Sequence, residues 1–162
     1  MAGEIDYGYT YDTNTVQVGK FSVVKPSSVN YKDGFVLPAA KNDVVLGVLQ
    51  DGIYPHGGSD FQKGIYTNVS QQAWPSNVTP SSPQGQKRPV RVFGRAQCIA
   101  AGACTRGDRA IIANNLGQVE DVDADSAITA GTAINVVGIF DTSCSNAGDV
   151  VYVLVNPHKE VK

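Results

Sequence analysis

Apolar residues occur along this chain in short runs, and turn-forming residues separate one run from the next. Runs of a few residues that are rich in Val, Ile, Leu and Phe are typical of β-strands rather than helices. The 17 glycines and 8 prolines fall largely between these runs, as expected of a chain with many tight turns. Helical periodicity is weak, and only Val122–Gly131 is compatible with one helical turn. The pattern predicts an all-β domain, with strands from Phe21, at Phe35–Leu37, at Val44–Leu49, from Val90, at Val136–Phe140 and at Val150–Val155.

Residues 1–19 have a different pattern. Tyrosines alternate with Gly and Thr, so the three rings share one face of an extended segment, and two valines continue a period-two pattern further along. Residues 1–12 contain almost no aliphatic side chain to bury against the chain's own core. We therefore predict an extended N-terminal arm over residues 1–19, with an ordinary first strand of the core as the alternative. The side chains expected to bind a partner are Tyr7, Tyr9, Tyr11, Val16 and Val18.

Residues 20–162 are predicted to form a single β domain that carries a long surface loop at about residues 54–89. This segment has few aliphatic residues, and its second half, Ser76–Pro89, is dense in Pro, Ser, Gln and Asn. Trp74, the only tryptophan, lies where that half begins. An exposed tryptophan there is a candidate contact anchor, and a lid over the core is the alternative.

Two parts of the chain repeat the same order of features. In each, a charged turn that contains glycine precedes a short apolar strand, and β-branched or aliphatic residues then flank a glycine within a second strand. The matching segments are Val45-Leu46-Gly47-Val48 and Val136-Val137-Gly138-Ile139. We predict a β domain built of two similar halves. The glycines within these strands are expected to mark a bulge or a close backbone crossing.

The tripeptide Arg106-Gly107-Asp108 has the form of a cell-adhesion signal, but it also matches the turns of this chain. A similar turn places Gly148-Asp149 directly before Val150. In such turns glycine supplies the positive φ, and the aspartate hydrogen-bonds its own backbone before the strand begins. We therefore interpret the tripeptide as a turn that leads into a strand, with an incidental arginine.

Charge and composition argue against several classes of partner. The formal net charge is −2 and the 13 Lys and Arg residues are scattered, so we expect no direct nucleic-acid partner and no membrane partner. No apolar stretch approaches the ~20 residues of a transmembrane helix, and the first residues lack the features of a signal peptide. We accordingly expect synthesis in a reducing cytoplasm. Cys98, Cys104 and Cys144 are then expected to be reduced, half-buried apolar residues.

The chain contains few residues of the kinds that catalysis and metal binding require. Its two histidines are His56 and His158, and the common catalytic and phosphate-binding motifs are absent. The sequence leaves a Cys–His dyad open, although only Arg106 is a basic neighbour that would lower a thiol pKa. The acidic residues of segment 120–125 lack the spacing of an EF-hand loop and are expected to form a solvated acidic loop. We expect no enzymatic activity, no cofactor and no bound metal.

The segment from Val90 to Val155 resembles the capsid cement, or decoration, proteins of tailed bacteriophages. The shared pattern begins with a Gly-x-Ala strand, a small-residue turn, a Gly-Asp pair that opens a strand and a glycine that closes it. A Val-Gly-Ile strand follows, and then Ala-Gly-Asp before a final strand rich in Val and Leu. Residues 21–51 repeat part of this pattern, whereas residues 54–89 have no counterpart in it. The positions that carry the resemblance are Gly94, Ala96, Gly107, Asp108, Gly117, Val137, Gly138, Ile139, Ala147, Gly148, Asp149 and Val150–Val155.

The resemblance implies a small β-barrel or β-tulip domain that sits as a trimer on the outside of a mature head. It also implies that the N-terminal arm adds a strand to the shell protein beneath. The implied partners are the major capsid protein and further copies of the chain, and the implied location is the outer capsid surface of the virion. A carbohydrate- or receptor-binding β-domain of a phage tail or fibre is the alternative, with Trp74, Tyr54 and Tyr66 as a sugar-stacking face.

Overall fold

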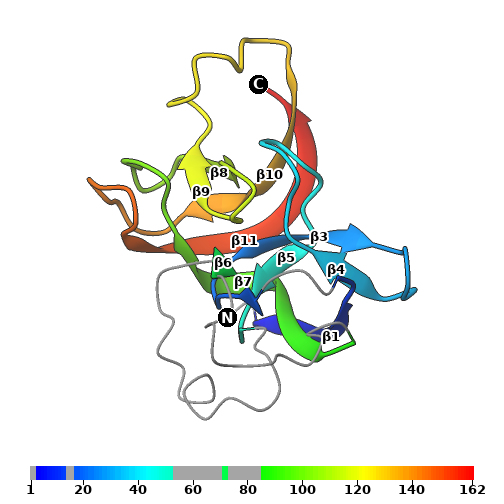
Figure 1. The fold of residues 1–162 in the computed structure, drawn as a ribbon. Helices are drawn as coiled ribbons and strands as arrows, with labels where there is room; N and C mark the ends of the chain where they lie inside the picture. Colours follow the sequence, from blue (N-terminus) through cyan, green and yellow to red (C-terminus); the bar gives the residue numbers. More distant parts are fainter. Residues whose placement is uncertain (1–2, 14–16, 53–70, 73–84) are drawn as a thin grey trace.

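The computed structural model describes residues 3–13, 17–52, 71–72 and 85–162 (Figure 1). Within these ranges the chain forms strands and turns without any helix, which confirms the all-β prediction for this part of the molecule. The described residues accordingly include no helix that is long and apolar enough to cross a membrane. The strands are β1 (Ile5–Tyr11), β2 (Gln17–Val18), β3 (Val23–Ser27), β4 (Gly34–Val36), β5 (Gly47–Leu49), β6 (Gln71–Gln72), β7 (Lys87–Ile99), β8 (Arg109–Ile112), β9 (Val119–Asp121), β10 (Ala133–Phe140) and β11 (Val150–Val161).

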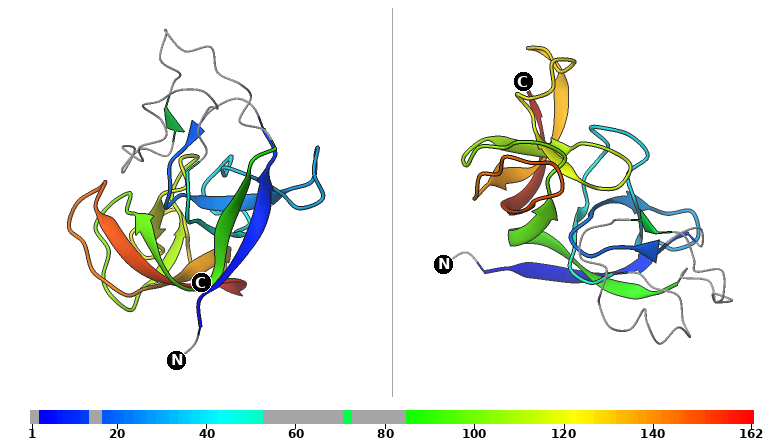
Figure 2. Two further views of the ribbon diagram at one scale, coloured as in Figure 1. Left: turned by 90° about the horizontal axis from the view of Figure 1, so that it is seen from below. Right: turned by 60° about the vertical axis from the view of Figure 1, so that its left-hand side comes forward.

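Five strands close into a barrel, which confirms the predicted β-barrel. The order around it is β1, β4, β3, β5 and β7, and β7 pairs back onto β1. Neighbouring strands are antiparallel except for β1 and β4, which are parallel. The closing pair extends from Ile5↔Phe93 to Thr10↔Lys87. In the left view of Figure 2, β1 and β7 run side by side.

Strand β7 is long enough to belong to two sheets. Its first part, Lys87–Phe93, lies in the barrel, and its second part, Gly94–Ile99, pairs with β11. Beyond β11 the second sheet continues through β10 and β8 to β9. At the junction Gly94 has a φ of 105°, which glycine adopts without strain. β10 and β11 run on together past the other strands as a two-stranded ribbon (Figure 1).

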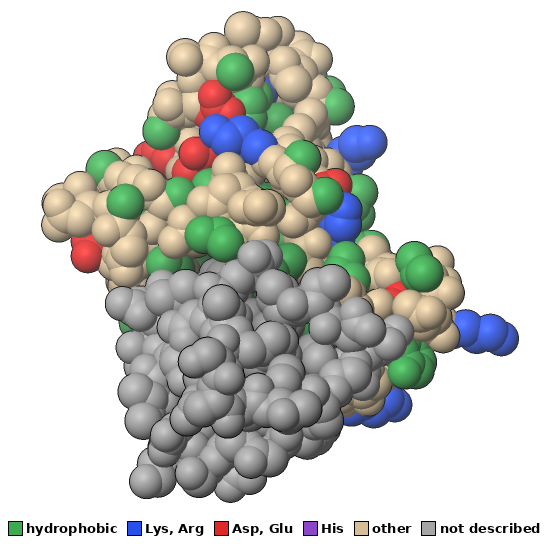
Figure 3. Space-filling model, viewed as in Figure 1, with side chains coloured by type: hydrophobic (Ala, Val, Ile, Leu, Met, Phe, Trp, Pro, Cys, Tyr) green, Lys and Arg blue, Asp and Glu red, His purple; other side chains and the backbone are tan. Residues whose placement is uncertain are grey.

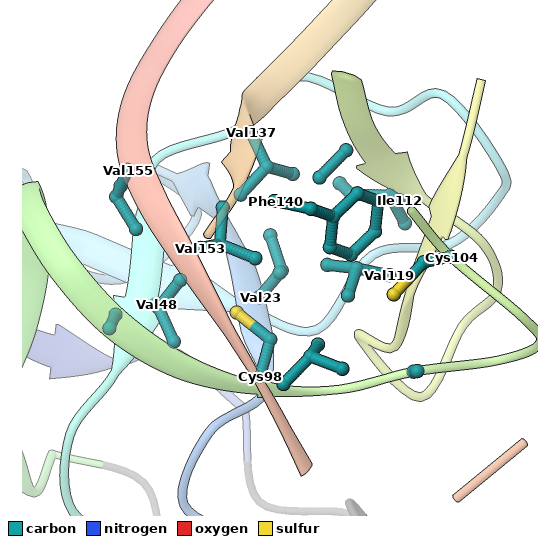
Figure 4. Packing of buried hydrophobic residues seen from close by; sticks show 14 residues of the cluster. Val23, Val48, Cys98, Cys104, Ile112, Val119, Val137, Phe140, Val153 and Val155 are labelled. Atoms are coloured by element: carbon teal, nitrogen blue, oxygen red, sulfur yellow. The ribbon is translucent and has the colours of Figure 1, made fainter. Parts of the chain in front are cut away.

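The core follows the two-residue period of the strands. In β11, Val151, Val153 and Val155 are buried, whereas the intervening side chains turn outward. The largest cluster joins β3 and β5 to the second sheet and packs around the ring of Phe140 (Figure 4). A second cluster lies within the barrel, and it consists of Tyr11, Val18, Val24, Phe35, Leu37, Leu49 and Val90.

The glycines within β5 and β10 lie at close backbone crossings. A Cβ atom on Gly138 would collide with the carbonyl oxygen of Leu154, and one on Gly47 would collide with that of Arg91. The register of β10 against β8 and β11 also shifts next to Gly138. The prediction of a bulge or a close crossing is confirmed at these positions. That the chain consists of two similar halves stays a prediction.

Several predicted boundaries are wrong in detail. β5 begins at Gly47, three residues after the predicted start at Val44, and Val122–Gly131 forms turns without a helical turn. The predicted surface loop includes Lys87–Pro89, but these residues pair with β1 and form the start of β7. The rest of the predicted loop, apart from residues 71–72 and 85–86, lies outside the described residues.

The predicted turn glycines adopt two different conformations. Gly107 and Gly148 have φ values of 97° and 90°, as expected of glycines in tight turns before a strand. The chain does turn at Lys32 and Asp33 as predicted, but Gly34 does not have the positive φ expected of a turn glycine. A Cβ on Gly34 would instead press against Asp12 and the backbone of Ser27, so close packing explains this glycine.

Candidate docking surface

An apolar groove opens on the surface where β7 leaves the barrel. It is a hollow of about 370 Å³ with walls formed by Phe93, Ile139 and Leu154. These three residues are 37%, 45% and 46% exposed, respectively. A cluster of large apolar side chains at the surface marks a site of interaction more often than single exposed residues do. We call this surface the apolar groove, and its lining is completed by Glu4, Gly94, Arg95, Gly138, Val155, Asn156 and His158.

Strand register brings the walls of the apolar groove together. Ile139 of β10 faces Leu154 of β11, and directly opposed residues project from the same face of a sheet. Phe93 is the last residue of β7 that pairs with β1. Between these walls the lining includes Gly94 and Gly138, where the backbone closely approaches Glu4 and Leu154, respectively.

Two lining residues of the apolar groove, Glu4 and Arg95, form ion pairs, and the ion pairs of Arg91 hold the start of β1 beside the groove. The Nε atom of Arg91 lies 2.7 Å from Asp6, and Glu4 lies 2.9 Å from the same guanidinium group. The hydrogen bond with Asp6 raises the pKa of Arg91 above its ordinary value. Arg95 pairs with Asp141 at 2.6 Å. Apolar walls with a charged rim are typical of a protein–protein contact.

Elsewhere on the described surface, charges of both signs are interspersed. Figure 3 shows basic and acidic side chains next to one another above the grey residues, with hydrophobic side chains scattered among them. The Lys41 ammonium group lies 2.6 Å from Glu120 and 3.0 Å from Asp125. Asp121 is buried, and burial raises the pKa of its carboxyl group. The prediction of a solvated acidic loop is therefore wrong for Glu120, Asp121 and Asp125, whereas the side chain of Asp123 is exposed.

The residues of the arm that were expected to bind a partner differ in how far they are buried. Tyr7 is 55% exposed, and its ring meets that of Tyr9 edge to face with centroids 6.5 Å apart. Tyr9 is half-buried against the cluster within the barrel. Tyr11 is wholly buried with its ring centroid 5.5 Å from that of Phe35, and burial raises its pKa. Val18 is also buried, whereas Val16 and Trp74 lie outside the described residues.

The end of β1 is fastened to the rest of the domain by Asp12. This buried carboxylate accepts hydrogen bonds from the backbone N–H groups of Val29 and Asn30, each at 3.0 Å, and from the hydroxyl of Ser27. Burial opposes its ionisation, but the hydrogen bonds outweigh burial and lower the pKa of Asp12. Residues 5–12 thus belong to the barrel and are not set apart from it as an arm. A role in binding a partner stays a prediction for the exposed side of β1.

The buried thiols have surroundings that disfavour the thiolate. Burial raises the pKa of the Cys98 thiol far above its ordinary value. Burial, together with the contact to Cys144, raises the pKa of Cys104 to about 12. Because the thiolate is the nucleophilic form, neither of these two cysteines is suited to attack an external electrophile at neutral pH.

His158, the histidine that the structure describes, makes local contacts through both ring nitrogens. His158 lies with Nδ1 2.7 Å from the carbonyl oxygen of Asn156 and Nε2 3.2 Å from Glu160. His56 lies outside the described residues. In the part of the chain that the structure describes, no group of three or more His, Cys, Asp or Glu residues is placed to hold a metal ion.

Sequence reasoning does not reveal that the side chains of two cysteines, Cys104 and Cys144, are in contact. The Sγ atoms of Cys104 and Cys144 lie 3.1 Å apart, although the residues are 40 positions apart in the chain. They meet because an isolated antiparallel bridge joins two loops. Neither loop has a strand pattern that would reveal the bridge.

The chain matches no protein-family model and no curated protein. The geometry above and the resemblance in residues 90–155 are the indications of its function. Three glycines of that resemblance, Gly107, Gly117 and Gly148, have φ values of 97°, 73° and 90°. These backbone conformations favour glycine. The fold therefore depends on glycine at three of the positions that carry the resemblance.

Proposed function

We propose that the chain is a structural decoration protein that binds the outer surface of a bacteriophage head and stabilises it. The observation that carries the proposal is the apolar groove, because an exposed apolar hollow with a charged rim is suited to contact with another protein. The resemblance in residues 90–155 indicates the class of protein. Gly94 and Gly138, two positions of that resemblance, line the groove.

The apolar groove would receive apolar side chains of the major capsid protein. Covering the exposed parts of Phe93, Ile139 and Leu154 would contribute about 1 kcal/mol each, or a few kcal/mol for the groove. This is a modest affinity for one site. A head offers the same site many times, so a small contribution at each seam between capsomers raises the barrier to their separation under the pressure of packaged DNA.

Strand β1 offers the same partner a row of backbone groups. β7 pairs with Ile5–Thr10, whereas β4 pairs only with Thr10 and Tyr11. Among the described strands, none pairs with the other edge of Ile5–Tyr9. An extended segment of the capsid protein would add at this edge, where main-chain hydrogen bonds give affinity and Tyr7 gives a side-chain contact. In this form of the proposal β1 receives a strand and does not reach out as a free arm.

We further propose that the protein attaches as a homotrimer. A cyclic trimer closes on itself and leaves no open end that would polymerise. Three grooves on one particle would also bind neighbouring capsid subunits together, so that weak single contacts add up to slow dissociation.

The test is binding of the purified protein to intact mature heads that lack it, measured by co-sedimentation. We expect saturable binding in a fixed ratio to the major capsid protein, and a higher temperature of DNA release from the decorated heads. In purified virions the chain should be present in many copies. A few copies per virion would instead assign it to the tail. Binding to a glycan array without binding to heads would support the carbohydrate-binding alternative and overturn the proposal.

A further inference from the structure

Two cysteines from different loops face one another beside the second sheet. Cys104 lies in the loop that follows β7, and Cys144 lies in the loop between β10 and β11. Their Sγ atoms are 3.1 Å apart, and the N–H group of each residue donates to the carbonyl oxygen of the other at 3.0 Å. Antiparallel residues paired in this way have Cα atoms about 5.5 Å apart, which lies within the range that a disulfide spans.

Other hydrogen bonds hold the two loops together without help from the sulfur atoms. The N–H group of Arg106 donates to the hydroxyl of Ser143 at 2.9 Å. The N–H group of Gly148 donates to the carbonyl oxygen of Ala100 at 2.8 Å. Because the backbone already fixes the register, a bond between the sulfurs requires a small movement of two side chains and no rearrangement of the loops.

We propose that Cys104 and Cys144 form a reversible disulfide, which we call the redox clip. The oxidant is a low-molecular-weight disulfide such as oxidised glutathione. The thiolate of Cys144, the more exposed of the two residues, attacks one sulfur of oxidised glutathione and releases one reduced glutathione. The thiolate of Cys104 then attacks the Cys144 sulfur of the mixed disulfide and releases the second. The two protein thiols lose two electrons and two protons, and both reduced glutathione molecules carry them away.

The third cysteine does not compete for either partner. Cys98 is wholly buried within β7. In Figure 4 its sulfur is well separated from that of Cys104, with Val119 between them in this view. Cys98 therefore serves as an internal control, because oxidation should leave its thiol free.

The redox clip would restrain a large part of the second sheet. The chain between Cys104 and Cys144 contains β8, β9 and β10, and β10 carries Ile139 of the apolar groove. A crosslink that closes a loop of this length should raise the thermal midpoint by about 10 °C. In a reducing cytoplasm the clip is open, and it closes outside the cell. That the clip closes on leaving the cell rests on the proposed function, whereas the formation of the disulfide does not.

The experiment uses the purified full chain, first fully reduced and then exposed to oxidised glutathione. We expect the intact mass to fall by two hydrogen atoms, and alkylation after denaturation to label one of the three cysteines. The thermal midpoint should rise by about 10 °C. Added reductant should reverse all of these changes.

Two variants test whether the disulfide joins Cys104 and Cys144. Trypsin leaves Cys98 and Cys104 on one peptide, because the nearest cleavage sites are Arg95 and Arg106. The crosslink is therefore mapped in Cys98→Ala, which should keep the rise in midpoint. Cys144→Ala replaces a half-exposed residue and should show no rise.

Three results would overturn the redox clip. These are two free thiols in oxidised Cys98→Ala, glutathione that stays attached to Cys144, and crosslinks between chains. None of these measurements involves phage heads, so failure of the clip and failure of the proposed function are distinguishable.

Discussion

At Gly138 the absence of a side chain allows β10 to lie against β11. A Cβ atom there would collide with the carbonyl oxygen of Leu154, which cannot move without disturbing the strand pairing. We expect Gly138→Ala to lower the free energy of unfolding by about 1–3 kcal/mol, measured by urea denaturation. Gly8→Ala is the matched control in β1, because no atom lies within 4 Å of its added Cβ. Equal stability of the two variants would contradict the close crossing.

The carboxylate of Asp12 makes stability depend on pH. Its pKa is lowered in the folded protein, so its contribution is fully present above the unfolded value of about 3.9 and is lost as the pH falls through the folded pKa. We expect Asp12→Asn to cost about 1–3 kcal/mol near neutral pH, because an amide nitrogen would face backbone N–H donors. The difference from the wild type should shrink below about pH 4.

Thermal unfolding of both proteins from about pH 3 to pH 7 measures this difference. Asp51→Asn removes an exposed carboxylate and serves as the control. A difference between wild type and Asp12→Asn that stays constant over this range would show that ionisation of Asp12 does not stabilise the fold.

At the scale of elements, β1 forms a wall of the barrel although its composition is that of a free arm. Deleting residues 1–12 would remove the strand between β7 and β4 and uncover Phe35 and Val90. We expect this deletion to unfold the domain or to lower its thermal midpoint strongly, measured by circular dichroism. Deleting only residues 1–4 leaves β1 intact and should have little effect on stability. The sequence pattern alone predicts little change for the longer deletion, and that outcome would restore the separate arm.

The sequence predicts those elements whose signal is local. The dense β-branched runs of β10 and β11 and the glycine within β10 are found from the residues themselves. The closure of the barrel cannot be predicted from local patterns, because it joins residues far apart in the chain. Asp6 and Arg91, for example, are 85 positions apart. The alternating pattern predicts that Tyr7 and Tyr11 share a face of the strand. It does not predict that Tyr11 packs against Phe35 and is buried, whereas Tyr7 is exposed.

The candidate site is harder to predict than the fold, for a physical reason. Ile139 and Leu154 are the kind of residue that fills a core, and they alternate with buried neighbours in ordinary strands. They lie at the surface because the described chain does not cover this face of the second sheet, where β10 pairs with β8 and β11 pairs with β7. The sequence pattern marks the glycines of the groove, but it does not show which strands approach each other closely there.

At the scale of the whole molecule, self-association and attachment to a head are separable. Light scattering of the purified protein should report a mass near three times 17.1 kDa. Leu154→Glu places a charge in the apolar groove, and we expect it to keep the trimeric mass but to lose binding to heads. A loss of about 1.4 kcal/mol at each of three linked grooves would weaken attachment by roughly a thousandfold. Val44→Glu changes an exposed valine outside the groove and should alter neither property.

The variants also decide which partner the apolar groove serves. If Leu154→Glu is monomeric with an unchanged thermal midpoint, the groove is the contact between copies, and attachment to the shell must depend on the open edge of β1. If Leu154→Glu binds heads as tightly as the wild type, the groove has no role in attachment. Only retention of the trimer together with loss of head binding assigns the groove to the capsid protein. That combination follows from the geometry proposed here, because the start of β1 and the groove lie together and would meet the shell as one surface.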